Sequence, residues 1–407
     1  MFISFPHRLD LRIWIVLHAM LVTTLASEIS VQKLADLMAD RSQGTARQVA
    51  RKMALQLMGQ QSLLKGKAVV KIEGCTVAWA IVNPEPTQVF HTDGTLLGKM
   101  TPLGDDGLQV LIQTFPNFTE FGYQIVSSGP PKARGTLRIE HYERAKETEP
   151  NADLPHGTLE KFSWEESHIY PRTQRTITVY IPKNYTKGDE ACLMVWQDGS
   201  RHADPNGTLR VSTVFDHLIH QKQMPVTIGV FVDPGRKLDQ EASEKPANRS
   251  LEYDSLGETY VRFLLDEILP ETERRLGVRF KKTPESRAIA GGSSGGICAF
   301  TAAWERPDQF SKVLAWVGSF VDIRGGNSYP YLLRITEKKP LRIYLLAGTH
   351  DLDNTFGHWP LANRMMESSL NFMGYDHRVE WTPCFHGSKG MAPNLPNALR
   401  WLWRDVQ

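Results

Sequence analysis

One short segment of this chain has the residue types and spacing of a nucleophilic site: Gly292-Ser293-Ser294-Gly295-Gly296. An apolar run precedes it and a helix-compatible run follows it. This is the G-x-S-x-G pattern between a strand and a helix, and a serine at the tip of such a turn can attack an ester carbonyl. Flanking glycines suit the turn, because a Cβ there would clash with the adjoining strand or helix. The pattern predicts Ser294 as the nucleophile; the alternative is a glycine-serine loop without chemistry.

A serine hydroxyl is a weak nucleophile until a base, usually a histidine held by a carboxylate, takes its proton. In α/β-hydrolases the acid and then the histidine follow the serine along the chain. His386 follows the last expected strand, 378–381, and precedes the final expected helix, 395–403. We therefore expect His386 to be the base. The alternatives are His350, His358 and His377.

The acid should lie just past a strand end that precedes His386. The expected strand 341–346 is followed by Ala347-Gly348-Thr349-His350-Asp351-Leu352-Asp353-Asn354. Asp351 is the first choice for the carboxylate, and Asp353 remains open. The competing interpretation is loop capping, which Asp performs well ahead of a helix.

The oxyanion of the tetrahedral intermediate needs two backbone donors. With Ser294 as nucleophile, one donor is the amide of Gly295. The second should come from an earlier strand-to-helix loop, and the segment Gln197-Asp198-Gly199-Ser200 is the candidate. Gly199 would let the backbone approach the substrate closely; the alternative is an ordinary tight turn.

The elements that position these residues begin after a predicted secretory signal at 1–27. Arg8 and Arg12 precede the apolar run 13–25, and small residues end it. That is the layout of a signal peptide, although an uncleaved anchor is the alternative. No later segment reaches the length of a membrane span. We therefore expect a secreted or periplasmic protein without a stable membrane span after cleavage.

The rest of the chain changes pattern twice. Residues 28–66 show helical periodicity, and 67–144 read as short strands separated by turn signals, typical of a small β-sandwich. The sandwich aromatics Trp79 and Tyr123 suggest core packing rather than a carbohydrate platform. A polar segment at 145–156 is predicted to be a linker. From 157 to 407 strands and helices alternate, which predicts an α/β fold with helices on both sheet faces.

Composition limits the class of partner. The 407 residues carry a formal net charge of +2, with 41% hydrophobic and 23% charged residues. That balance gives no support to a nucleic-acid partner. Neither a metal-binding spacing of Cys and His nor a phosphate-binding loop occurs, so no cofactor and no metal are expected.

Taken together, these residues resemble the esterase family that includes enterochelin esterase and the feruloyl and acetylxylan esterases. The resemblance covers about 157 to 407. It implies a three-layer α/β-hydrolase domain, and an N-terminal immunoglobulin-like domain is common in similar members. The matching segments are 173–175, 195–199, 232–235, 248–254, 292–296 and 348–354.

The resemblance carries the nucleophile onto Ser294 and the base onto His386, while the acid varies among similar enzymes. It also includes Arg249 and Glu252. The two could form a buried Arg–Glu pair that braces the site, and the alternative is that Arg249 contacts the substrate.

These patterns lead to three hypotheses. The first is a secreted serine esterase that acts on a small-molecule or polysaccharide ester of sugar, hydroxycinnamate or siderophore type. The second is an acyltransferase with the same triad. The third is a non-catalytic carbohydrate-binding or scaffold protein that shares the fold. Neither the ester nor the oligomeric state can be read from the sequence.

Overall fold

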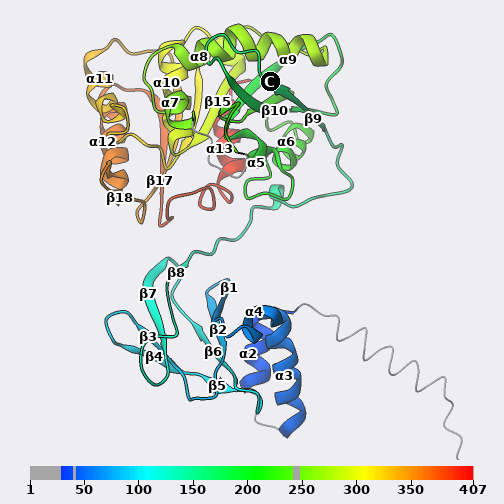
Figure 1. Cartoon of the computed structure of the whole chain (residues 1–407). Coiled ribbons are helices and arrows are strands. Elements are labelled where there is room, and N and C mark those ends of the chain that lie inside the picture. The colour runs from blue at the N-terminus through cyan, green and yellow to red at the C-terminus, as the bar shows by residue number, and fades with distance from the viewer. Residues whose placement is uncertain (1–28, 40–42, 242–247, 407) are drawn as a thin grey trace, which may run out of the picture. The chain divides into compact units, whose positions relative to one another are not determined.

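The computed structural model describes residues 29–39, 43–241 and 248–406. The chain divides into two compact units, 1–141 and 142–407 (Figure 1). The predicted signal peptide, 1–27, lies outside the described residues. None of the helices in the described part of the chain combines the length and the hydropathy that a membrane span requires.

The first unit contains two antiparallel sheets of four strands each. One sheet has the order β1-β2-β6-β5, and the other has the order β4-β3-β7-β8. The bounds are β1 Val69–Glu73, β2 Thr76–Val82, β3 Gln88–His91, β4 Leu96–Lys99, β5 Thr101–Pro102, β6 Leu108–Thr114, β7 Thr119–Val126 and β8 Ala133–Ile139.

Strand β2 is buried on both of its faces, because it separates two cores. Trp79 packs with residues of both sheets, among them Tyr123 at a ring-centroid distance of 6.1 Å. Ala78 and Ala80 instead face a second cluster that the helices supply. Those helices are α2 (Val31–Ala39), α3 (Gln43–Met58) and α4 (Gln60–Leu64). Trp79 and Tyr123 are therefore core residues of this unit.

The segment predicted to be a linker, 145–156, differs from that expectation at its start. Residues Lys146–Thr148 form a 3-10 turn, and Thr148 is fully buried. Its carbonyl accepts a hydrogen bond of 3.0 Å from Arg210, and Glu147 pairs with Arg400. These contacts attach the start of the segment to the second unit.

The second unit is built on a ten-stranded mixed sheet. The main path has the order β13-β10-β12-β11-β15-β16-β17-β20, with β9 paired to β10 and β14 to β11. Strands β11, β12, β15, β16, β17 and β20 run parallel, and β10 is antiparallel to β9 and β12. The bounds are β9 Thr158–Trp164, β10 Thr173–Ile181, β11 Glu190–Gln197, β12 Thr227–Val232, β13 Arg236–Lys237, β14 Arg279–Phe280, β15 Arg287–Gly292, β16 Lys312–Trp316, β17 Arg342–Gly348 and β20 Asp376–Thr382.

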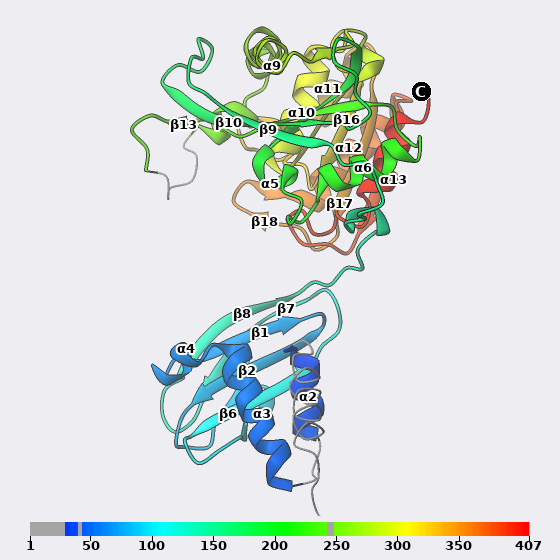
Figure 2. The same ribbon diagram turned by 90° about the vertical axis from the view of Figure 1, so that its right-hand side faces the viewer.

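Helices cover both faces of this sheet, so the unit has three layers (Figures 1 and 2). Successive side chains of a strand point to opposite faces. In β11, Val195 therefore joins one hydrophobic cluster and Trp196 joins the other. The helices are α5 Gly199–Ala203, α6 Val211–His220, α7 Arg249–Tyr253, α8 Thr259–Arg262, a π-helical stretch Phe263–Ile268, α9 Leu269–Leu276, α10 Ser294–Glu305, α11 Tyr329–Ile335, α12 Trp359–Phe372 and α13 Leu395–Trp403.

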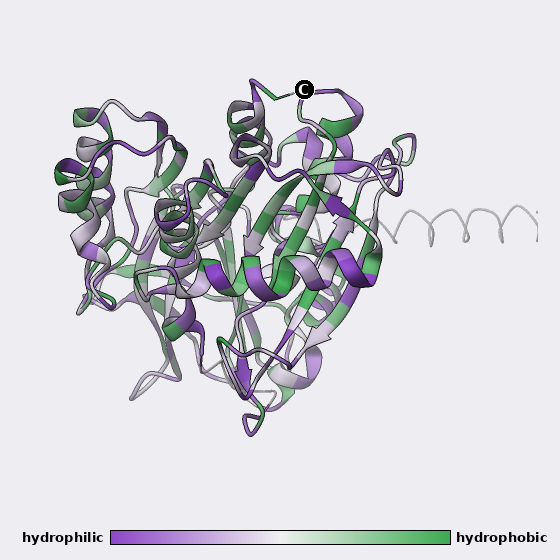
Figure 3. Ribbon diagram, turned by 90° about the horizontal axis from the view of Figure 1, so that it is seen from above, coloured by the Kyte–Doolittle hydropathy of each residue, from purple (hydrophilic) through white to green (hydrophobic). Residues whose placement is uncertain are grey.

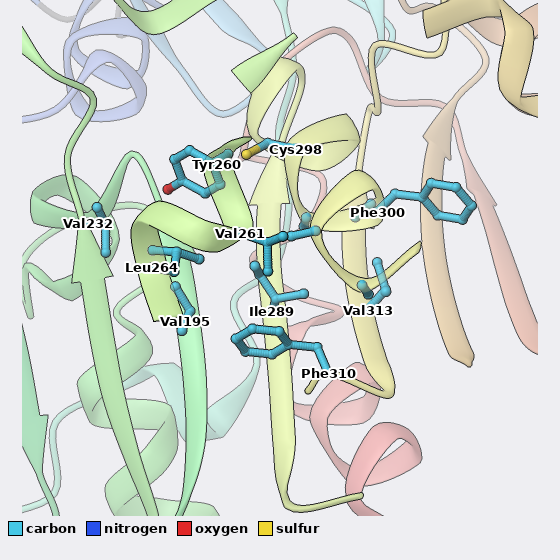
Figure 4. Packing of buried hydrophobic residues seen from close by; sticks show 14 of the residues in the cluster. Val195, Val232, Tyr260, Val261, Leu264, Ile289, Cys298, Phe300, Phe310 and Val313 are labelled. Atoms are coloured by element: carbon cyan, nitrogen blue, oxygen red, sulfur yellow. The ribbon is translucent and has the colours of Figure 1, made fainter. Parts of the chain in front are cut away.

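The larger cluster fills the space between the sheet and helices α8 and α10. Figure 4 shows Val195 and Ile289 of neighbouring strands near Leu264, and all three are fully buried. The strands are coloured mostly as hydrophobic, whereas the helices carry both hydrophobic and hydrophilic residues (Figure 3). Burial of strands on both faces is expected in a parallel sheet between two helical layers.

The parallel strands place their carboxyl ends at one edge of the sheet, where ligands of open α/β folds bind. The last residues of the parallel strands at this edge are Gln197, Val232, Gly292, Trp316, Gly348 and Thr382.

The turn after β15 requires glycine for steric reasons. A Cβ on Gly291 would lie 2.2 Å from the carbonyl oxygen of Gly295, and one on Gly292 would lie 2.3 Å from the Trp316 indole nitrogen. The glycines thus allow helix α10 to start directly against the end of the strand.

We predict that Gly291→Ala destabilises the second unit by roughly 3 kcal/mol, as overpacking against backbone does. The matched control is Gly188→Ala, where φ is +102° and a Cβ would meet nothing within 4 Å. The control should lose only about 1 kcal/mol through backbone strain. Denaturant unfolding of both variants measures the difference. Equal losses in the two variants would contradict this account of the turn.

Candidate active site

Ser293 occupies the turn between β15 and α10 in a backbone conformation that is rare for a residue with a side chain. Its φ is 60° and its ψ is −125°. The main chain holds this strain: the Ser293 amide donates to the Trp316 carbonyl at 3.0 Å, and its carbonyl accepts from Ser319 at 3.1 Å. Strain of this kind costs about 1–3 kcal/mol and persists only where the surroundings impose it.

The Ser293 hydroxyl is hydrogen-bonded to a histidine and, through it, to a carboxylate. Ser293 Oγ lies 2.8 Å from His386 Nε2, and His386 Nδ1 lies 2.6 Å from Asp351 Oδ1. The Asp351 side chain is 1% exposed and the imidazole is 19% exposed. The carboxylate is thus shielded, while the histidine keeps access to the solvent side of the site.

Neighbouring groups hold this chain of three in position. The Trp359 ring stands edge-on to His386 at 5.7 Å between centroids, and its indole nitrogen donates to Ser319 at 3.3 Å. Asp351 also accepts a hydrogen bond of 2.7 Å from the Leu352 amide. The imidazole can therefore accept the Ser293 proton at Nε2 while it donates from Nδ1 to Asp351.

The expectation that Ser294 faces His386 is wrong by one residue. Ser294 is the first residue of α10, and its side chain interacts with Asp254 instead. Burial raises the pKa of the Asp254 carboxyl, and the Ser250 and Ser294 hydroxyls act against that rise. Only Ser293 has the strained backbone that presents a side chain from the tip of the turn.

The sequence alone left the register of this motif open, and the structure decides it. Two G-x-S-x-G matches overlap, Gly291–Ser293–Gly295 and Gly292–Ser294–Gly296. The steric need is greatest at Gly291, where a Cβ would meet the carbonyl of Gly295. A strand of six residues ending at Gly292 leaves Ser293 as the turn residue.

The other candidates for acid and base lie elsewhere in the structure. Asp353 is exposed and pairs with His358 across a small hairpin, β18 (Asp353–Asn354) with β19 (Gly357–His358). The His358 side chain also accepts from the Leu361 amide at the start of α12. His377 bonds to the Tyr375 carbonyl at 2.9 Å, and His350 lies against Phe385. The structure brings Asp351, rather than Asp353, to His386.

The shift in register also moves one expected oxyanion donor. The residue after Ser293 is Ser294, so the amide of Ser294 takes the position that was expected for Gly295. Gly295 instead faces the turn after β11, because a Cβ on it would lie 3.1 Å from Gln197 Cβ. Gln197, which belongs to the segment expected to supply an oxyanion donor, is fully buried there.

The turn after β11 has two of its amides occupied. Asp198 N–H donates to Tyr253 Oη at 3.1 Å, and Ser200 N–H donates to Asp233 at 2.8 Å. Among the described residues, Gly199 is then the candidate donor of this turn. A Cβ on Gly199 would lie 2.2 Å from the backbone of Phe231, so only glycine fits.

Helix α7 and the residue after it contact both sides of this region. Arg249 binds Asp198 through two bonds, Nε–Oδ1 at 2.8 Å and Nη2–Oδ2 at 2.7 Å. Tyr253, one helical turn later, accepts the Asp198 amide, and Asp254 interacts with Ser294. One short element thus holds the turn after β11 and the start of α10.

Asp198 is charged despite its burial. Burial by itself would raise the pKa of its carboxyl, but the hydrogen bonds and the charge of Arg249 outweigh that effect and lower it. Asp198 adopts a left-handed conformation with φ 52°. The bidentate pair therefore holds Asp198 in this left-handed backbone conformation, which is uncommon for a residue other than glycine.

The expected pair of Arg249 with Glu252 is not formed. Glu252 instead binds Arg175 of β10, at 2.5 Å and 2.9 Å, and neither side chain is exposed. The Glu252 carboxylate also accepts from Asn248 at 2.6 Å. This buried pair anchors α7 to the sheet, while Arg249 is left to bind Asp198.

A cavity of about 570 Å³ opens beside the turn after β11. Asp198 and Arg249, two of the expected substrate-binding residues, line it together with Ser200 and Arg201. Within the described ranges, no group of three or more His, Cys, Asp or Glu residues is placed to hold a metal ion.

Comparison with known proteins agrees with this architecture. The model of the Putative esterase family matches residues 169–401. The uncharacterized protein YbbA of Bacillus subtilis is 22% identical over 245 residues, which span 56% of this chain and 92% of that protein.

Solved structures of esterases share the fold. The enterobactin esterase FES of Shigella flexneri superposes with a TM-score of 0.58 at 17% identity, over 86% of this chain and 99% of that one. The ferric enterobactin esterase of Salmonella typhimurium gives 0.57 at 15% identity, over 84% and 96%. A ferulic acid esterase of Anaeromyces mucronatus gives 0.50 at 17% identity, over 63% and 94%.

The family match spans more than half of the chain and contains Ser293, His386 and Asp351. The chain therefore belongs to the Putative esterase family.

Proposed function

We propose that this protein is a serine hydrolase of carboxylic esters. The observation that carries the proposal is the hydrogen-bonded chain from Ser293 through His386 to Asp351 at the carboxyl edge of the sheet. A hydroxyl on a strained strand-to-helix turn, a histidine base and a buried carboxylate form the arrangement of an α/β-hydrolase.

In the proposed reaction, Ser293 Oγ attacks the ester carbonyl carbon as His386 Nε2 takes the hydroxyl proton. Asp351 accepts the Nδ1–H of His386 and stabilises the imidazolium that forms. The amide of Ser294 and that of Gly199 are the proposed donors to the oxyanion. His386 then protonates the leaving alcohol, and a water molecule activated by the same histidine hydrolyses the acyl-serine.

We further propose an immunoglobulin-like sandwich for the first unit and export through the N-terminal signal. With β1 to β8 taken as strands A, B, C, C′, D, E, F and G, the two sheets read A-B-E-D and C′-C-F-G. That is the strand order of immunoglobulin-like sandwiches. Export is supported by the charged and apolar parts of residues 1–27.

We expect Ser293→Ala to lower kcat/KM for p-nitrophenyl acetate by at least about 10⁴-fold, because the nucleophile is lost. The matched control is the adjacent serine: Ser294→Ala removes a hydroxyl that faces Asp254 and should retain activity within about tenfold, since its amide stays in place. Purified protein and initial rates are sufficient for this comparison. If Ser294→Ala instead lost the activity and Ser293→Ala kept it, Ser294 would be the nucleophile.

The two aspartates of the acid loop provide a second test. Asp351→Asn should lower kcat by roughly 10⁴-fold, because an amide no longer favours the tautomer that leaves Nε2 free to accept a proton. Asp353→Asn, at an exposed hairpin position, should change kcat by less than about twofold. Steady-state kinetics on folded protein decides between them. Similar losses in both variants would contradict the assignment.

Asp198 is proposed as a positioning residue for the oxyanion site. Asp198→Asn weakens the bond to Arg249, so the Gly199 amide should lose its fixed direction and kcat should fall about tenfold or more, with KM changed little. The matched control is Asp266→Asn, which removes one charge from an exposed pair with Arg262 at 3.6 Å. Kinetics and a thermal melt of each variant separate positioning from stability. A loss of stability with unchanged kcat would argue against this role.

A further inference from the structure

The cavity beside the turn after β11 lies at the edge of the sheet where β9, β11 and β12 end and the antiparallel β10 begins. Eleven residues line it, and they come from β9, β10, α5, α7, β13 and the turns after β11 and β12. Asp198 also borders the nucleophile turn, since its Oδ2 is 3.6 Å from the position of a Cβ on Gly295. A substrate bound at Ser293 can therefore extend into this cavity.

Ten of the eleven residues that line the cavity are polar or charged, which is unusual for a ligand cavity, because most are lined mainly by apolar and aromatic side chains. A group rich in oxygen or nitrogen would find hydroxyl and amide partners in Ser163, Thr176 and Gln174.

The charged side chains of the lining differ in how closely each is paired with an opposite charge. Arg175 is paired with Glu252, and Arg249 is held by both oxygens of Asp198. The Asp233 carboxyl accepts both the amide and the hydroxyl of Ser200, and burial raises its pKa.

Two further guanidinium groups border the cavity. Arg201 is only loosely paired, with Nη2 at 3.4 Å from Asp198 Oδ2 and 62% of its side chain exposed. Arg236 of β13 also lines the cavity, and its Nη1 donates to the Glu241 carbonyl at 3.2 Å. The lining thus carries four arginines against two aspartates, and its net charge is positive even with the buried Glu252 included.

We propose that this cavity binds an anionic group of the ester substrate, a carboxylate, sulfate or phosphate borne on a polar scaffold. This inference rests on the proposed hydrolase function and specifies its substrate class. Arg201 is the specificity-determining residue, because a guanidinium group can donate two parallel bonds to such an anion.

The test uses two ester pairs that differ in charge and little in size. The acyl-side pair is 4-nitrophenyl hemisuccinate and 4-nitrophenyl pentanoate. The alcohol-side pair is 4-acetoxybenzoate and 4-acetoxybenzamide. The wild-type protein should show a KM about tenfold lower for the anion of at least one pair, the size of a hydrogen bond to a charged group. The pair that responds identifies which side of the scissile bond enters the cavity.

The variant is Arg201→Gln, with Arg262→Gln as its matched control. Arg262 is similarly exposed, at 58%, and similarly paired, with Asp266 at 3.6 Å, but it does not line the cavity. Arg201→Gln should remove the preference for the anion and leave the KM of the neutral ester within about twofold. Arg262→Gln should behave like the wild type.

A binding measurement on a variant without the nucleophile tests the anionic cavity separately from the hydrolase proposal. Ser293→Ala should bind the anionic product of the responding pair, succinate or 4-hydroxybenzoate, in a calorimetric titration, and the added Arg201→Gln change should abolish that binding. Equal KM values within both pairs, together with no binding of either anion, would overturn the anionic cavity even for an active esterase. Activity that is the same in wild type and Ser293→Ala would instead overturn the hydrolase proposal, whatever the anion binding shows.

Discussion

The strained turn at Ser293 is the constraint on which the rest of the site depends. A residue with a side chain is held at φ 60°, ψ −125° between a buried strand and a helix. Two features make the conformation possible: glycines that leave space for the helix start, and main-chain hydrogen bonds to Trp316 and Ser319 of the neighbouring strand and loop. Because the turn is fixed, the Ser293 hydroxyl points to His386 without reorganisation, which is the geometric basis of the proposed catalysis.

The second constraint is a buried network of charges around α7. Arg175 and Glu252 are both inaccessible to solvent, and two hydrogen bonds join their side chains. Loss of one partner of such a pair typically costs about 3–5 kcal/mol, because an unpaired charge stays buried. This pair sets the position of α7, and α7 in turn places Arg249 on Asp198 and Tyr253 on the Asp198 amide. The turn after β11 is thus held to the body of the sheet through these charges and through Tyr253, which is buried in the larger hydrophobic cluster.

Local patterns predicted the α/β alternation well, and they placed Asp351 and His386, because both follow expected strands in the chain order that the serine motif requires. They did not distinguish Ser293 from Ser294, since two glycine frames overlap and only the strand end decides between them. The sequence also did not predict the partner of Arg249. Glu252 lies on the same helix, whereas Asp198 is 51 residues away and lies beside Arg249 only because of the strand order of the sheet. The exclusion of Gln197 from the cavity depends on burial, which no single-sequence pattern encodes.

The most direct measurement of the central claim is covalent labelling of the nucleophile. A fluorophosphonate ester phosphonylates an activated serine hydroxyl and releases fluoride, so tandem mass spectrometry of the labelled peptide that spans 288–300 identifies the modified residue. We expect one adduct, on Ser293, and no adduct when His386 is replaced by Ala. An adduct on Ser294, or labelling of Ser293 that does not depend on His386, would contradict it.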